Sequence, residues 1–216
     1  MDLFDTKIAA QVAAKLLQIE AIRLQPENPF TWASGWKSPI YCDNRLSLSY
    51  PEVRSFIKEN LVKAINANFK DVAGIAGVAT AGIPQGALIA DSMNLPFLYV
   101  RSKPKEHGMG NMIEGKVSPG QKIVVVEDLV STGGSSLKAV QDLKNAGFDV
   151  LGMVSIFTYG FDVAKNNFNE AKVKLICLSD YASMLPQALA DDYIDDQTLA
   201  SLVEWRKSPE SWKGYR

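Results

Sequence analysis

The segment VVVEDLVSTGGSS, residues 124–136, constrains the fold of this chain more than any other. An apolar, β-branched run ends in two adjacent carboxylates, Glu127 and Asp128. A short turn rich in glycine and hydroxyl groups follows, and residues 135–147 then have the pattern of a helix. A buried strand that leads through such a turn into a helix is typical of an α/β sheet, in which ligands bind at the carboxyl ends of the strands.

The turn itself has the composition of an anion site. Glycines let backbone N–H groups approach an anion, and a helix N-terminus adds unpaired N–H donors and partial positive charge. We therefore predict a phosphate cup formed by Thr132, Gly133, Gly134 and Ser135. A second interpretation is that these polar residues only cap the helix. Neither the Walker pattern nor G-x-G-x-x-G occurs, which argues against a P-loop and a dinucleotide site.

The two carboxylates are unexpected beside a phosphate, because like charges repel. They need a hydroxylic or cationic partner, and vicinal sugar hydroxyls or a Mg²⁺ ion would both serve. The segment therefore predicts a phosphorylated sugar, held by its phosphate at the turn and by its hydroxyls at Glu127 and Asp128.

Apolar runs and helical periodicity alternate through the rest of the chain. We expect strands at 72–79, 95–102, 122–127, 149–160 and 173–179, and helices at 5–24, 51–68, 83–93, 135–147 and 182–205. This alternation predicts a mostly parallel central sheet flanked by helices. We expect a single domain over 1–216, in which 1–50 form an N-terminal helix and a small non-periodic hood (residues 25–50), and 51–216 form the α/β core.

The connection at 102–120 is long, polar and rich in glycine, which is typical of a functional loop. It carries Lys103, Lys105 and His107, and Arg101 precedes it. We interpret it as a lid that closes over a pyrophosphate and excludes water, although a solvated surface loop would have the same composition. A second small turn, Thr80, Ala81 and Gly82, precedes a helix and could contact another phosphate group.

Composition excludes several other classes of function. A net charge of −1 provides no overall field for a polyanion, so nucleic-acid binding is disfavoured. No apolar run approaches the ~20 residues that span a bilayer, and the N-terminus lacks the pattern of a signal peptide. The two cysteines, Cys42 and Cys177, form no disulfide framework, so we expect a reducing, cytoplasmic environment. The single histidine, His107, excludes multi-histidine metal sites.

Residues 124–136 resemble the 5-phosphoribosyl-1-pyrophosphate (PRPP) signature of type I phosphoribosyltransferases, which has an apolar strand, two acidic residues, two apolar residues and then Thr/Ser-Thr-Gly. The hood segment FTWASGWKSPIYCDNR, residues 30–45, resembles the N-terminal motif of orotate phosphoribosyltransferases. The lid segment RSKPKEHGMGNMIEG also resembles the catalytic loop of that family.

This resemblance implies the type I phosphoribosyltransferase fold and transfer of a phosphoribosyl group from PRPP to N1 of orotate, in pyrimidine biosynthesis. It implies that Mg²⁺ is carried by PRPP, with no direct protein ligand, and that the catalytic residues are Lys105, His107, Glu127 and Asp128. It places Ser131 against orotate, and it implies a homodimer whose lid enters the neighbouring site. The residues expected to contact PRPP are Arg101, Lys105, His107, Glu127, Asp128, Leu129, Val130, Ser131, Thr132, Gly133, Gly134 and Ser135.

The chain departs from some family members at two positions. Ala33 and Ser102 stand where those members carry lysine, and Lys37 and Lys103 are nearby cations that would compensate. Two other functions remain open from the sequence: a PRPP-binding regulatory protein that has lost the chemistry, and a phosphoribosyltransferase for another nucleobase.

Overall fold

The computed structural model describes residues 1–32, 35–103, 112–116 and 118–212. Its main sheet has seven strands in the order β1-β11-β10-β9-β6-β7-β8. Every pairing in it is parallel except that of β7 with β8. The strands are β1 (Asp2–Leu3), β6 (Gly74–Val78), β7 (Phe97–Val100), β8 (Ile113–Glu114), β9 (Lys122–Val130), β10 (Asp149–Thr158) and β11 (Leu175–Asp180). The predicted mostly parallel sheet is confirmed.

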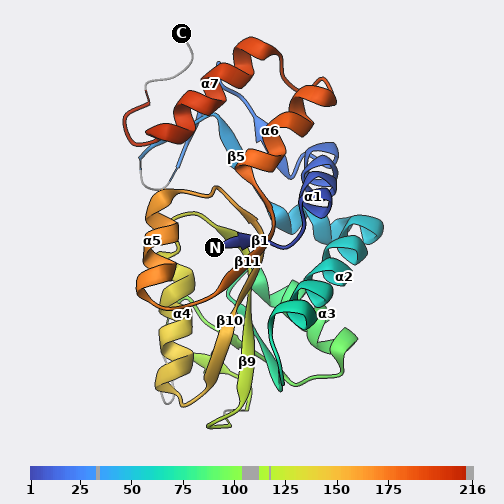
Figure 1. Cartoon of the computed structure of the whole chain (residues 1–216), viewed down its shortest axis with the longest axis vertical. Helices are drawn as coiled ribbons and strands as arrows, with labels where there is room; N and C mark the ends of the chain where they lie inside the picture. Colours follow the sequence, from blue (N-terminus) through green and yellow to red (C-terminus); the bar gives the residue numbers. More distant parts are fainter. Residues whose placement is uncertain (33–34, 104–111, 117, 213–216) are drawn as a thin grey trace.

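Helices cover both faces of this sheet. On one side lie α1 (Thr6–Gln18), α2 (Pro51–Asn68) and α3 (Gly82–Met93), and on the other lie α4 (Gly134–Asn145) and α5 (Asp162–Glu170) (Figure 1). The side chains of β9 alternate accordingly: Val124 and Val126 belong to the core on the first side, and Ile123 and Val125 to the core on the second. A strand that is buried on both faces has a continuous apolar sequence, and for this reason the sequence predicts a strand at 122–127.

Strand β9 is longer than the sequence predicts. We expected it to end at Glu127, but it continues to Val130, where it pairs with Thr158 of β10. The hydroxyl of Thr158 also donates a hydrogen bond to the carbonyl of Val130, at 2.9 Å. Because Glu127 and Asp128 are polar, hydrophobic periodicity alone placed the strand end too early. Both carboxylates therefore lie within the ordered sheet, and the turn begins only at Ser131.

Two predicted helices are wrong in extent. Helix α1 ends at Gln18 instead of continuing to 24, because Glu20 adopts a left-handed φ of 57° and Ile22–Leu24 form strand β2. The predicted helix 182–205 is two helices, α6 (Tyr181–Ala190) and α7 (Asp196–Lys207). Asp192 (φ 57°) breaks the first, and the carboxylate of Asp195 caps the second. Helix α5 and the short strands β1 and β8 were not predicted.

The described part of the hood contains the short strands β3 (Phe30–Thr31), β4 (Lys37–Ser38) and β5 (Ile40–Cys42) and a 3₁₀ helix, in agreement with its lack of helical periodicity. Strand β2 pairs with β5, β3 pairs with β4, and η1 spans Asn44–Ser49. Helix α7 contacts the hood, because the indole N–H of Trp205 donates a hydrogen bond to the carbonyl of Lys37 at 3.1 Å. Figure 1 shows α7, α6 and β5 together at one end of the molecule.

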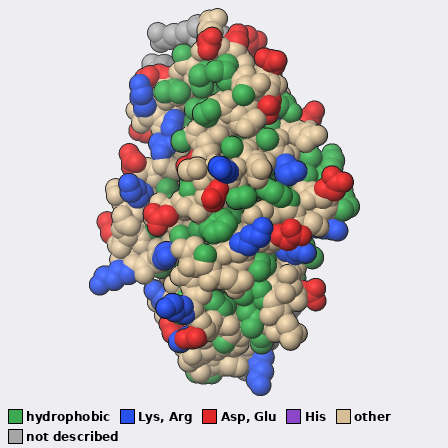
Figure 2. Space-filling model, turned by 45° about the vertical axis from the view of Figure 1, so that its right-hand side comes forward, with side chains coloured by type: hydrophobic (Ala, Val, Ile, Leu, Met, Phe, Trp, Pro, Cys, Tyr) green, Lys and Arg blue, Asp and Glu red, His purple; other side chains and the backbone are tan. Residues whose placement is uncertain are grey.

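The surface carries charges of both signs. Figure 2 shows Lys and Arg side chains interspersed with Asp and Glu on the face it presents. A mixed surface of this kind does not concentrate polyanions. Within the described residues, no helix has both the length and the hydropathy to cross a membrane.

Candidate active site

Glu127 is a buried carboxylate, and each of its two oxygens accepts a hydrogen bond. It is 6% exposed. One oxygen accepts a hydrogen bond from the backbone N–H of Asp128 at 3.0 Å, and the other accepts from the hydroxyl of Ser136 at 3.0 Å. Burial raises the pKa of the Glu127 carboxyl well above its usual range, and the charge of Asp128 adds to the rise. A ligand that brings positive charge here would therefore favour the ionised form.

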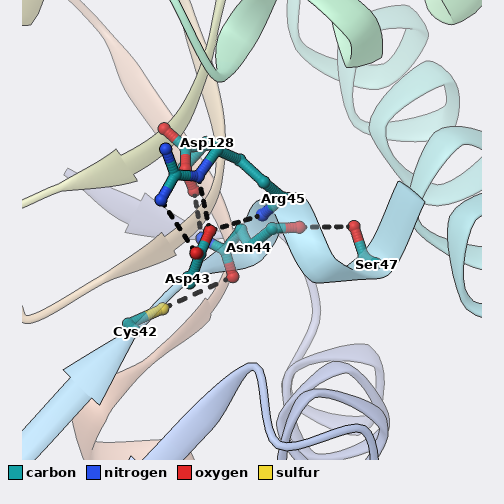
Figure 3. Close-up of polar contacts among 6 residues, drawn as sticks. All are labelled: Cys42, Asp43, Asn44, Arg45, Ser47 and Asp128. Carbon is teal, nitrogen blue, oxygen red and sulfur yellow. Dashed lines mark hydrogen bonds and ion pairs between the residues drawn. The ribbon is translucent and has the colours of Figure 1, made fainter. Parts of the chain in front are cut away.

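Asp128 is half-buried and lies at the junction with the hood. Burial raises the pKa of its carboxyl, while hydrogen bonds and the nearby charge of Arg45 act in the opposite direction. Its backbone carbonyl accepts a hydrogen bond from the side chain of Asn44 at 2.8 Å (Figure 3). Two carboxyl groups with raised pKa values side by side are a common mark of a functional site.

The predicted phosphate cup follows immediately. Gly133 has a φ of +83°, and a side chain there would contact Phe168 at 2.7 Å, so both backbone conformation and space require glycine. Thr132, Gly134 and Ser135 are exposed. Among the described residues, no side chain caps the N-terminus of α4. The interpretation that these polar residues merely cap the helix is therefore wrong, and the first N–H groups of α4 are available to an anion.

A cavity of about 300 Å³ adjoins the turn. It lies between the hood and the ends of β9 and β10, and its walls are Thr31, Trp32, Tyr41, Cys42, Leu129, Ser131 and Tyr159. The ring of Trp32 packs against that of Tyr159 with centroids 4.9 Å apart. Burial raises the pKa of the Tyr159 phenol, so its hydroxyl remains a hydrogen-bond donor. The cavity thus has the character of a site for a flat, polar ring.

The second turn lies beside the first, because β6 and β9 are neighbours in the sheet. Thr80, Ala81 and Gly82 connect β6 to α3, and the described residues provide no side-chain cap for this helix either. A side chain at Gly82 would collide with the carbonyl of Val126, so glycine allows the turn to pack against β9. Two uncapped helix N-termini therefore open at the same edge of the sheet.

The structure describes the lid only in part. Arg101 follows β7, and its guanidinium forms an ion pair with Glu114 of β8 at 3.1 Å. Ser102 and Lys103 are exposed, and the carbonyl of Lys103 accepts a hydrogen bond from Arg101 at 3.2 Å. Lys105, His107 and Ala33 lie outside the described residues. Lys37 donates to the hydroxyl of Thr31, at 2.8 Å, and so lies next to a residue that lines the cavity.

Searched over the described residues, the chain provides no group of three or more acidic, cysteine or histidine side chains placed to hold a metal ion. Both oxygens of Glu127 are already engaged by hydrogen-bond donors.

The chain also matches known proteins, which assign it to a class. The family model of the phosphoribosyl transferase domain matches residues 49–185, a range that contains both turns and the carboxylate pair. The fold and the site therefore define a phosphoribosyltransferase, an enzyme that transfers a pentosyl group.

Individual relatives narrow the class. The orotate phosphoribosyltransferase of Cytophaga hutchinsonii is 61% identical over 203 residues, which cover 94% of this chain and 97% of that protein. The one from Porphyromonas gingivalis is 57% identical over 201 residues, 93% of this chain and 96% of the relative. The crystal structure of the Aeropyrum pernix orotate phosphoribosyltransferase superposes with a TM-score of 0.71 at 25% identity, covering 82% of this chain and 97% of that one. The chain belongs to the orotate phosphoribosyltransferase family, as its motifs predicted.

Sequence reasoning missed most of the residues that line the cavity beside the turn. Only Ser131 was assigned to it, whereas Trp32, Tyr41, Cys42 and Tyr159 also form its walls. Three of these four lie in the segment 30–45 that carried the resemblance, but nothing in their spacing shows which side chains point inward. Asn44 lies in the same segment and was likewise given no role.

Proposed function

We propose that this chain catalyses the Mg²⁺-dependent transfer of the 5-phosphoribosyl group from PRPP to N1 of orotate, which yields orotidine 5′-monophosphate and pyrophosphate. The observation that carries the proposal is the order of parts along one stretch of chain: a carboxylate pair of which Glu127 is buried, a wall of the cavity at Leu129 and Ser131, and an uncapped helix N-terminus. A phosphorylated ribose that spans these parts would present its anomeric carbon toward the cavity.

In this proposal the 5′-phosphate binds the backbone N–H groups and hydroxyls of Thr132, Gly133, Gly134 and Ser135, where the helix dipole favours an anion. The strand that leads into the cup is paired with β10 at Leu129 and Val130, so its position in the sheet is set before PRPP binds. Pre-formed donors of this kind need no reorganisation when the ligand binds.

Glu127 and Asp128 would accept hydrogen bonds from the ribose hydroxyls. Positive charge that develops on the ribosyl ring as the pyrophosphate leaves would then lie near both carboxylates and lower their raised pKa values. This interaction strengthens as the bond breaks, which is the condition for it to increase the rate.

The leaving pyrophosphate requires positive charge on the opposite side. We assign it to Arg101, Lys105 and His107, together with the backbone N–H groups of Thr80, Ala81 and Gly82. When bound, Mg²⁺ supplies Lewis-acid stabilisation of the pyrophosphate oxygens. Arg101 would exchange its ion pair with Glu114 for the pyrophosphate, a modest cost because the pair is partly exposed.

We further propose a cytoplasmic homodimer of single-domain subunits, in which the lid of one subunit enters the site of the other. In that arrangement dimer formation becomes part of catalysis. Lys37, which lies next to a residue that lines the cavity, and Lys103 would supply the cations that Ala33 and Ser102 lack.

The test is an assay with purified protein, PRPP, Mg²⁺ and orotate, monitored by the loss of orotate absorbance. We expect turnover that requires all components. Parallel reactions with uracil and with adenine measure base specificity, and product formation with one of them alone would favour a different phosphoribosyltransferase. PRPP binding without turnover of any base would instead favour a regulatory protein.

A further inference from the structure

Asn44 lies where the hood meets the core, at the start of η1, and is only 2% exposed. Its side-chain amide donates a hydrogen bond to the backbone carbonyl of Asp128 at 2.8 Å, although the two residues are 84 positions apart. Figure 3 shows this side chain directed at the end of β9 that carries the carboxylate. It is therefore a direct link between the hood and the predicted ribose site.

The Asn44 amide donates to a backbone carbonyl that lies beyond the end of the neighbouring strand β6. The last register pair between β6 and β9 is Gly77 with Val126, so in the described structure β9 extends beyond β6. At Asp128, two side chains take the place of hydrogen bonds to a neighbouring strand. The carboxylate of Glu127 accepts from the backbone N–H of Asp128, and the amide of Asn44 donates to the backbone carbonyl of Asp128. A buried carbonyl without a donor costs about 1–3 kcal/mol, so removing Asn44 would allow this end of β9 to shift toward another partner.

The other end of the same amide contacts the base cavity. Its oxygen accepts a hydrogen bond from the thiol of Cys42 at 3.4 Å, and Cys42 is one of the cavity walls. Burial raises the pKa of the Cys42 thiol well above its usual range, and Asp128 and Asp43 add to this, so the thiol stays protonated and donates. One amide thus connects a wall of the base cavity to the backbone of a carboxylate.

The backbone around Asn44 is fixed from both sides. The hydroxyl of Ser47 donates to the carbonyl of Asn44 at 2.6 Å. Asp43 accepts from the backbone N–H of Arg45 and forms a two-pronged ion pair with its guanidinium, at 2.6 and 2.8 Å (Figure 3). The amide is therefore pre-positioned by its own loop, as a positioning group must be.

We propose that Asn44 is a positioning residue for phosphoribosyl transfer. It holds the Asp128 segment of β9 in register with the base cavity, so that the anomeric carbon and the accepting ring nitrogen meet. It does not touch the reacting atoms itself. This inference rests on the proposed function, because it assigns Asn44 a part in that same reaction.

The test compares Asn44→Ala and Asn44→Asp with the wild-type enzyme at saturating PRPP and orotate. Displacement of a reacting group by about 1 Å can reduce a rate by 100-fold, so we expect kcat to fall by about 10- to 100-fold in both variants. Asn44→Asp keeps the shape but replaces the donor with an acceptor, and is expected to fall further. Cys42→Ala, which removes the donor to the Asn44 amide oxygen and also trims the cavity wall, should raise the KM for orotate and leave the KM for PRPP unchanged.

Asn60 provides the matched control. It is also 2% exposed, and its amide donates to the carbonyl of Phe56 at 2.8 Å, within α2 and outside the site. Asn60→Ala removes a buried amide outside the site, and kcat should be unchanged. The proposal is overturned if Asn44→Ala likewise has wild-type kcat and KM.

The remaining outcomes are also decisive. If Asn44→Ala does not fold, wild-type kinetics in the isosteric Asn44→Asp would overturn the proposal. If neither Asn44 variant folds, wild-type orotate KM in Cys42→Ala would overturn it. A wild-type enzyme that turns over no orotate would instead overturn the proposed function itself.

Discussion

The end of β9 and the hood contribute to one site in different ways. The β9–α4 segment places the carboxylates, a cavity wall and an uncapped helix N-terminus within a dozen consecutive residues. The hood contributes Thr31, Trp32, Tyr41 and Cys42 from two separate small sheets, and these side chains meet the core only in the folded chain. In the proposed function, one continuous stretch of chain would therefore bind the phosphate and the ribose, whereas residues distant in the sequence would bind the base. Variants of the two regions should therefore have separable effects.

Asp128→Asn should have the largest effect and tests the β9 side. The variant keeps the shape of the side chain but removes the charge that, in the proposed function, would face the developing positive ribosyl ring. We expect kcat to fall about 100- to 1,000-fold, as for other preorganised electrostatic groups. PRPP affinity, measured by calorimetry, should change by much less. Equal losses in kcat and affinity would assign Asp128 to ground-state binding.

Lys105→Ala extends the comparison to the lid. We expect a loss in kcat of about 100-fold, because a cation that meets the leaving pyrophosphate is removed. Mixing this inactive variant with inactive Asp128→Asn should restore part of the activity if the lid acts across a dimer. Mixed dimers that form, as seen by mass spectrometry, yet remain inactive would show that each subunit uses its own lid.

Trp32→Leu tests the hood side alone. Trp32 lines the cavity, so in the proposed function its loss would remove a stacking contact with the base. Such contacts contribute about 1–3 kcal/mol per base, so the KM for orotate should rise about 10-fold. The KM for PRPP should not change. Trp212→Leu is the control, because Trp212 packs against the same core without lining the cavity. A parallel rise in both KM values would break the separation between the two regions.

Gly133→Ala tests whether the phosphate turn needs its unusual backbone. The new methyl group would meet Phe168 and a φ of +83°, so we expect the free energy of unfolding to fall by about 1–3 kcal/mol, with weaker PRPP binding. Gly134→Ala is matched to it, because nothing lies within 4 Å of a side chain there. Chemical denaturation of both variants measures the contrast, and identical curves would refute the role of Gly133.

Glu127→Gln should change stability, and this is the smallest of the stability effects predicted here. Because the pKa of Glu127 is raised in the folded protein, folding favours its protonated form, and this carboxyl makes the folded state less stable as the pH rises through that pKa. The glutamine amide can still accept a hydrogen bond from the backbone N–H of Asp128 and form one with the hydroxyl of Ser136. The variant should match the wild type near pH 4 and unfold at higher denaturant concentration at pH 8. Exposed Glu59→Gln is the control, and a variant that is less stable at pH 8 would contradict this prediction.

The features that the sequence predicted are local ones, and the features that it missed depend on contacts between distant residues. Strands with β-branched runs, helix α2 and the glycine turn of β9–α4 were readable because period and turn chemistry are local properties. The ends of α1, the break between α6 and α7, and the extension of β9 to Val130 depend on left-handed residues and strand partners that periodicity does not register. The bond from Asn44 to Asp128 joins residues 84 positions apart, and no pattern in one sequence indicates such a contact.

The most direct test of the account is a crystal structure of the enzyme with PRPP and Mg²⁺. It should show the 5′-phosphate on the backbone N–H groups of residues 132–135, the ribose hydroxyls on Glu127 and Asp128, and the anomeric carbon facing Trp32 and Ser131. A PRPP molecule whose phosphate lies away from this turn, or whose ribose leaves both carboxylates uncontacted, would contradict the central claim.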